Sequence, residues 1–132
     1  MKNLVCVFVF TICFIGLSAQ TTKYKGTMQY GSYTRENVIV EVQNNNPVTI
    51  IMYNVKFSRF MPLTVDMTIK GLQKTSKSYS GTNIVPLIKQ TPHEKYIIKT
   101  IKAVADNGAL QIEAVFGVDG SKKMIFSGKL MK

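Results

Sequence analysis

The residues that could support catalysis in this chain are few and scattered. His93 is the only histidine, and it lies between Pro92 and Glu94 in a stretch expected to be a loop. A catalytic histidine needs a nucleophile and an orienting group within hydrogen-bond reach, and no motif in the sequence supplies them. We therefore expect His93 to be a surface residue, and we expect no catalytic residue in this protein.

The seven acidic residues do not form the clusters that hydrolases and metal sites use. Asp106 and Asp119 stand in turn sequences, whereas Glu41, Asp66 and Glu113 fall on outward positions of expected strands. A zinc site needs three or four neighbouring His, Cys or carboxylate ligands, and a glycosidase needs two facing carboxyl groups. We expect neither a metal nor another cofactor, and we predict that the protein is not an enzyme.

Both cysteines fall within an amino-terminal segment that has the form of an export signal. Lys2 is followed by the uncharged, apolar stretch 4–17 and then by Ser18-Ala19-Gln20. The stretch is shorter than the roughly 18 apolar residues of a spanning helix, and it matches the hydrophobic region of a signal peptide. We predict cleavage after Ala19; the alternative is an uncleaved membrane anchor.

Cleavage at this position would leave residues 20–132 as a single domain of 113 residues without cysteine. Neither Cys6 nor Cys13 follows the small residue that a lipoprotein signal requires. A chain of this size can bury a core without disulfide bonds. The sequence thus predicts an exported protein, periplasmic or at the cell surface, with no transmembrane segment after signal cleavage.

The expected mature chain is strongly basic. Lys2 leaves with the signal, so that 16 of the 17 basic residues remain against seven acidic ones, a net charge of +9. Such a charge favours anionic partners. Nucleic acid is not expected, because the protein is exported and only Arg35 and Arg59 could read base edges. Acidic glycans and lipid phosphates fit better; the alternative is that the lysines only keep the domain soluble.

Period-two alternation of apolar residues predicts about eight short strands. The expected strands cover residues 24–30, 36–43, 48–55, 63–70, 82–88, 109–116 and 122–131, together with 92–105 if that segment is a strand. Residues 44–47, 106–108 and 117–120 have the composition of turns. Residues 57 and 60–62 form an apolar corner, and the polar residues 71–81 are expected to be a loop.

Two segments allow more than one structure. Thr91 and Glu94 have the spacing of a capping box, and Pro92 suits the first turn of a helix. In contrast, the β-branched residues of 97–104 favour a strand leading into the next hairpin. Pro86 lacks the N–H that a ladder needs, which makes 82–88 an expected edge strand or bulge.

Glycines near both ends of the mature chain predict that the sheet closes. Gly26 lies in the first expected strand and Gly128 in the last, where barrel strands bend sharply. Pairing these two strands would remove both exposed edges. We predict an all-β fold, an eight-stranded antiparallel up-and-down β-barrel, with a β-sandwich as the alternative. Leu63, Val65, Met67, Ile69 and Leu130 are among the residues expected to point inward.

Four stretches carry a family resemblance: Tyr24-x-Gly26-Thr27-Met28, Ser78-Tyr79-Ser80-Gly81, Asp106-Asn107-Gly108-Ala109-Leu110 and Met124-Ile125-Phe126-Ser127-Gly128. Together they resemble the calycin-like (lipocalin-like) β-barrel domains of exported bacterial proteins over nearly the whole mature chain. The resemblance implies a barrel and, by analogy with calycins at large, a small hydrophobic molecule bound in the barrel mouth.

Two binding surfaces follow from these expectations. The first is a barrel interior that holds a small hydrophobic or amphipathic ligand, unless the side chains simply fill it. The residues expected to line it are Met28, Tyr30, Val40, Val42, Ile50, Met52, Met67, Ile69, Leu110, Ile112, Phe116, Met124 and Phe126. The second belongs to a structural or adhesive surface module that binds acidic glycans or lipid phosphates. Its expected lysines, on loops at strand ends, are Lys74, Lys77, Lys89, Lys95, Lys122 and Lys123.

Overall fold

The computed structural model describes residues 21–44, 47–57, 63–117 and 122–131. They form one antiparallel sheet and a single turn of 3-10 helix. The strands are β2 (Thr21–Tyr30), β3 (Tyr33–Gln43), β4 (Val48–Val55), β5 (Val65–Thr75), β6 (Ser78–Ile84), β7 (Leu87–Ile88), β8 (Thr91–Pro92), β9 (Ile98–Asp106), β10 (Ala109–Phe116) and β11 (Lys123–Leu130), and the helix is η2 (Glu94–Tyr96).

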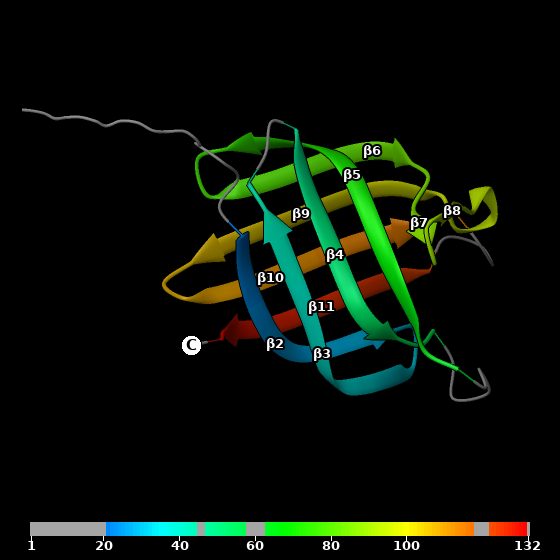
Figure 1. The fold of residues 1–132 in the computed structure, drawn as a ribbon, viewed down its shortest axis with the longest axis horizontal. Coiled ribbons are helices and arrows are strands. Elements are labelled where there is room, and N and C mark those ends of the chain that lie inside the picture. Colours follow the sequence, from blue (N-terminus) through cyan, green and yellow to red (C-terminus); the bar gives the residue numbers. More distant parts are fainter. Residues whose placement is uncertain (1–20, 45–46, 58–62, 118–121, 132) are drawn as a thin grey trace, which may run out of the picture.

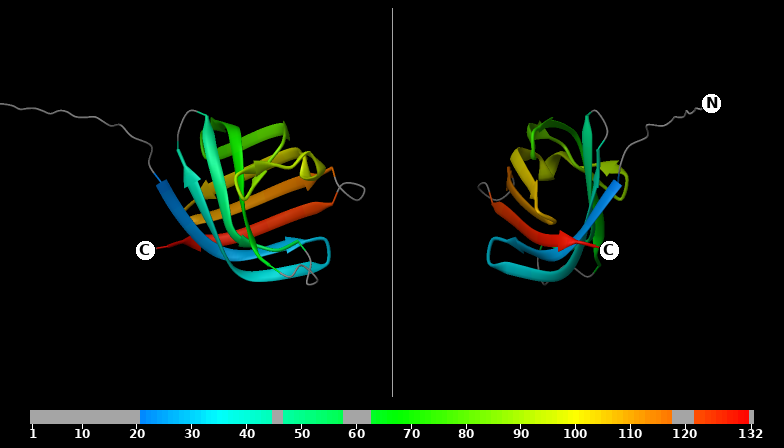
Figure 2. Two further views of the ribbon diagram at one scale, coloured as in Figure 1. Left: turned by 45° about the vertical axis from the view of Figure 1, so that its right-hand side comes forward. Right: turned by 90° about the vertical axis from the view of Figure 1, so that its left-hand side faces the viewer.

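Eight of these strands close into a barrel. The order around the sheet is β4-β3-β2-β11-β10-β9-β6-β5, and a further pairing of β5 with β4 completes the circle. β9, β10 and β11 run side by side on one wall, and β3, β4 and β5 cross them on the other (Figure 1). Two turned views show the same enclosed arrangement (Figure 2). The predicted antiparallel barrel is confirmed, and the sandwich alternative is wrong.

The first and last strands of the barrel pair with each other, as the positions of their glycines led us to expect. Gly26 on β2 lies directly opposite Gly128 on β11. A Cβ atom added to Gly26 would lie only 2.0 Å from the carbonyl oxygen of Ser127 and 2.4 Å from the Cα of Gly128. No side chain fits that space, so the close approach of β2 and β11 requires glycine at this position.

Inward alternation holds along most strands and fails at two strand ends. Val38, Ile50 and Met67 are fully buried in the core, as period two requires. In contrast, Leu63 is 65 % exposed and Leu130 is 43 % exposed, so both predictions were wrong. Leu63 precedes β5 and is outside the pleat, and Leu130 is the last residue of β11, at the barrel mouth.

The predicted loop over residues 71–81 is a hairpin instead. β5 continues through Gly71, which has a φ of +83°, and ends at Thr75. β6 begins at Ser78, and the last three residues of β5 pair with its first three. Polar composition suggested a loop, but barrel closure supplies backbone partners for this segment whatever its side chains are.

The connection between β6 and β9 combines the structures that the sequence left open. β6 pairs with β9 from Ser78 to Ile84, whereas only Ser78–Ser80 pairs with β5. Its second half is thus edge-like, as Pro86 suggested. Between β6 and β9, where every residue is described, helical structure is limited to the three residues of η2. β9 begins at Ile98, so strand is correct for 98–105. Predictions for residues 1–20, 45–46, 58–62 and 118–121 lie outside the described residues.

Candidate functional site

The thirteen side chains expected to line a ligand pocket do lie inside the barrel, where they contact one another. Tyr30 is 5 % exposed, Val42 and Ile112 are 1 % exposed, and the other ten are fully buried. All thirteen belong to one hydrophobic cluster. Solvent reaches very little of these side chains. Among the described residues, the burial therefore supports a barrel filled by its own side chains over one with a ligand cavity.

Aromatic rings close one end of the barrel. The ring of Phe57 lies 5.0 Å from that of Tyr30, 5.7 Å from that of Phe116 and 5.5 Å from that of Tyr96, on which it stacks. Burial of these rings at edge-to-face and stacked geometries is favourable. The segment around η2 is held to this end by the Gly117 N–H, which donates to the Ile97 carbonyl at 2.8 Å.

Two buried tyrosines occupy the opposite end. The Tyr79 hydroxyl donates to Oδ1 of Asn44 at 3.1 Å. Burial raises the pKa of Tyr79. Burial also raises the pKa of Tyr24, and repulsion from a Tyr79 phenolate adds to the effect. Both phenols therefore stay protonated to a higher pH than an exposed tyrosine does.

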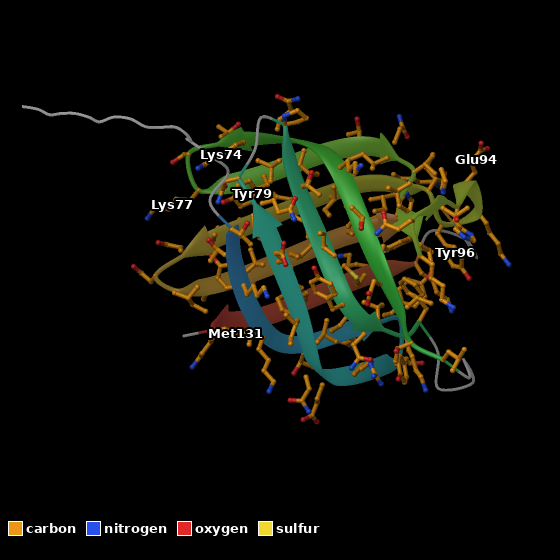
Figure 3. The ribbon with its side chains drawn as sticks, in the orientation of Figure 1. Lys74, Lys77, Tyr79, Glu94, Tyr96 and Met131 are labelled. Carbon is orange, nitrogen blue, oxygen red and sulfur yellow. The ribbon has the colours of Figure 1, made fainter. Side chains whose placement is uncertain are left out.

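The six lysines predicted as a basic surface do not form one. Lys74, Lys77 and Tyr79 lie at one end of the barrel, whereas Glu94 and Tyr96 lie at the other (Figure 3). Lys77 pairs with Asp106 at 2.8 Å, and Lys74 lies 6.0 Å from the ring centre of Tyr79.

The remaining predicted lysines belong to the end that carries η2. Lys123 lies 3.9 Å from Glu113. Lys95 and Lys122 lie over the rings of Tyr96 and Tyr30 at 5.9 and 5.6 Å. Only Lys89, in the turn between β7 and β8, has no such interaction among the described residues. Five of the six predicted lysines thus have partners within the protein.

A different group of lysines comes together on the outer face of β2 and β11. Lys25 lies directly opposite Lys129 in the ladder, and Lys23 is two residues away on the same face of β2. All three are exposed. In the part of the chain that the structure describes, none of them has an ion-pair or hydrogen-bond partner for its ammonium group. We call these three residues the β2–β11 lysine cluster.

The neighbours of this cluster add two hydroxyl groups and one carboxylate. Thr27 and Ser127 form the next outward pair along the same two strands. Glu41 is opposite Lys23 across the β2–β3 ladder, but it is only 9 % exposed. Its carboxylate accepts from Tyr53 at 3.0 Å and from Gln43 at 2.7 Å. Lys25 and Lys129 have no such acid opposite them, because their other ladder partners are Ile39 and Ala109. The uncompensated positive charge of this face is therefore that of Lys25 and Lys129, beside the hydroxyl donors of Thr27 and Ser127.

The sequence contained a signal for this cluster in its glycines, although the predicted basic surface did not include these three lysines. Pairing of the first and last strands was expected from Gly26 and Gly128. Placing those glycines opposite each other fixes the register, which puts Lys25 opposite Lys129 one step away. The sequence alone did not specify this register. A shift by a single residue would place different residues opposite the lysines.

Catalytic and metal-binding groups do not gather anywhere in the described ranges. His93 is half-exposed and directly precedes η2, with its ring centre 6.4 Å from that of Tyr96. No three His, Cys or acidic residues among those described lie close enough to hold a metal ion. Nor does any described helix have the length and apolarity to cross a bilayer.

Comparisons with known proteins add no relative. A scan of protein-family models, a search of curated proteins and a search of solved structures each found no match to this chain.

Proposed function

We propose that this chain is an exported, non-catalytic binding module that binds anionic groups on the outside of its barrel, at the β2–β11 lysine cluster. The observation that carries the proposal is the unneutralised pair Lys25 and Lys129, directly opposite on adjacent strands. The chemistry recognised is that of a phosphate, sulfate or carboxylate group. Such groups are found on acidic glycans and on lipid headgroups.

Like charges directly opposite in an antiparallel ladder are unfavourable. Side chains at such positions have Cβ atoms about 5 Å apart, and the repulsion costs up to about 1 kcal/mol. An anion bound between the two ammonium groups would turn this repulsion into attraction. Thr27 and Ser127, the adjacent outward pair, would donate further hydrogen bonds to its oxygens.

The interior of the barrel is the second candidate site, and its buried side chains disfavour it. A small-ligand site normally offers several hundred Å³ of space, whereas ten of the thirteen inward residues expected to line one are fully buried. An internal ligand would have to displace side chains that already fill the core. The outer face of β2 and β11 needs no such rearrangement.

Charge reversal at Lys25 tests the proposal. Lys25→Glu places a carboxylate opposite Lys129, so the pair becomes attractive and the free energy of unfolding should rise by about 0.5 kcal/mol. Affinity for heparin, a sulfated glycan, should fall more than about tenfold, because one attractive contact is lost and a repulsive one is gained. Titration calorimetry and urea denaturation measure the two effects on the same preparation.

Lys89→Glu is the matched control, since it changes the net charge equally at a turn away from the cluster. It should reduce heparin affinity far less than Lys25→Glu. Equal losses in the two variants would show that only net charge matters and would overturn the proposed site.

Vesicles of phosphatidylglycerol, used in parallel, distinguish the sources of the anion. Loss of vesicle binding on Met131→Ser, with heparin binding kept, would assign the site to lipid, because Met131 is the exposed apolar residue beside Lys23.

A further inference from the structure

A depression lies on the outer face of β4 and β5 and shares no residue with the lysine cluster. It has a volume of about 450 Å³, and its floor and rim include Thr49, Ile51, Thr68, Lys70 and Gln90. Gln90 comes from the turn between β7 and β8 and is the residue of that hairpin that lines the groove. The volume lies within the range of about 300 to 1,000 Å³ in which small-molecule sites fall.

Thr68 has a hydroxyl whose environment points to a ligand. The residue lines this groove and is 6 % exposed. Among the residues that the structure describes, its side chain has no hydrogen-bond partner. Buried hydroxyls are nearly always satisfied, because leaving one unpaired is unfavourable. A partner for Thr68 is therefore expected to come from the groove.

The turn that carries Gln90 is strained. Lys89 has a φ of +53° and Gln90 a φ of +67°. Two-residue hairpins of this type favour Asn-Gly, because side chains such as those of Lys and Gln are disfavoured at positive φ. Strain of this kind tends to be retained where it positions a functional group. Here it holds the Gln90 amide at the rim, where that amide has no partner among the described residues.

We infer that this groove binds a short neutral oligosaccharide. Its polar groups are mainly uncharged hydroxyls and amides, which suit the hydroxyl groups of a sugar, and Lys70 is its one charged residue. Ile51 and Pro47 present an apolar surface to the C–H face of a sugar ring. Thr68 and Gln90 donate and accept hydrogen bonds with the sugar hydroxyls. The inference does not depend on the anion-binding site.

Titration with neutral oligosaccharides tests the inference. The probes are α-1,4-, β-1,4- and β-1,3-linked glucose oligomers of about three residues, added to about 10 mM, a concentration that fills a millimolar site. In ¹⁵N spectra the amide signals of Thr49 and Ile51 should shift, whereas that of Ile125 on β11 should not. If no probe shifts Thr49 or Ile51, the inference is wrong.

Two variants separate binding from folding. Thr68→Val keeps the shape but removes the unpaired hydroxyl, so Tm should be unchanged or higher while sugar affinity falls about fivefold. Lys89→Asn/Gln90→Gly relieves the strained turn, so Tm should rise while sugar affinity falls. Thr82→Val, on the outer face of β6, is the control and should leave the affinity unchanged. A lower Tm for Thr68→Val would show that the hydroxyl is bonded within the protein, which would overturn the inference.

Failure here is distinguishable from failure of the proposed function. The probes carry no charge, so Lys25→Glu should leave their affinity unchanged. Loss of neutral-sugar binding in that variant would place the sugar at the lysine cluster rather than in the groove.

Discussion

Gly26 and Gly128 bring the first and last strands of the barrel within a distance that no larger residue tolerates. A Cβ atom on Gly128 would lie 2.5 Å from the ring of Phe126 and 2.9 Å from the backbone oxygen of Lys25. The same backbone approach sets Lys25 opposite Lys129. The two glycines that allow the barrel to close therefore also fix the geometry of the proposed anion site.

Substitution of Gly26 by alanine should destabilise the protein by about 1 to 3 kcal/mol, the usual cost of inserting a methyl group where none fits. The obstructing atoms belong to the backbone of Ser127 and Gly128, which cannot rotate away as side chains do. Urea denaturation measures the change in the free energy of unfolding.

Gly81→Ala provides the comparison for this loss of stability. Its added methyl group would meet the terminal Cδ1 of Ile84 at 2.5 Å, and that atom can move with a rotamer change. The loss at Gly81 should be clearly smaller than at Gly26. Equal losses would mean that the close approach of β2 and β11 is not what requires glycine at position 26.

Among the elements, those with strict alternation could be predicted from the sequence and those shaped by barrel closure could not. β10 follows its expected range because Leu110, Ile112 and Phe116 alternate with polar residues. The end of β5, Gln73 to Thr75, is polar and is a strand because β6 pairs with it. Partners distant in sequence decide such segments, and no local pattern records them.

The same distinction applies to the candidate sites. The interior residues were identified correctly because alternation alone shows which side chains face the core. To predict that the lysines of β2 and β11 cluster, one must know the register between two strands that are about a hundred residues apart in sequence. To predict the groove on β4 and β5, one must also know the position of Gln90. That position depends on a turn in which two residues have a left-handed φ that their side chains disfavour.

The segment between β6 and β9 is held to the barrel by few interactions, and Tyr96 is central among them. Its ring stacks on Phe57 at 5.5 Å and 16°, and such a pair contributes about 1 kcal/mol. In Tyr96→Ala the amides of Gly117 and Lys89 should exchange hydrogen faster, because they donate to Ile97 and Asp66 across the contact of this segment with the barrel.

Exchange at the middle of β10 should stay unchanged in that variant, since only local opening is involved. Tyr33→Ala serves as the control, because Tyr33 is also a half-buried tyrosine but lies at the start of β3. If Tyr96→Ala accelerates exchange uniformly over the barrel, the segment is not a separate unit and its attachment is part of global stability.

At the scale of the whole molecule, the two proposed binding surfaces are neighbours on the outside of the barrel. Lys23 pairs across the ladder with Glu41, and Gln43 at the edge of the groove donates to the same carboxylate. Glu41 thus lies between the lysine cluster and the groove. Because side chains fill the core, both proposed binding surfaces are on the outer face.

Alkaline pH should destabilise the whole barrel through the tyrosines at one end. The folded state raises the pKa of Tyr79 and Tyr24 above the ordinary 10.0, mainly by burial. Folded protein therefore keeps phenol protons that the unfolded chain releases. Their contribution to stability is complete below about pH 10 and is lost as the pH rises through the raised values.

Urea denaturation at pH 8 and at about pH 11 measures this loss, and Tyr79→Phe shows how much of it belongs to Tyr79. At pH 8 the variant should be less stable by about 1 kcal/mol, because the bond to Asn44 is gone. Between the two pH values it should lose less stability than the unaltered protein, since phenylalanine has no proton to release. An equal loss in both proteins would mean that the alkaline transition comes from groups other than Tyr79, and that burial at this end of the barrel does not control it.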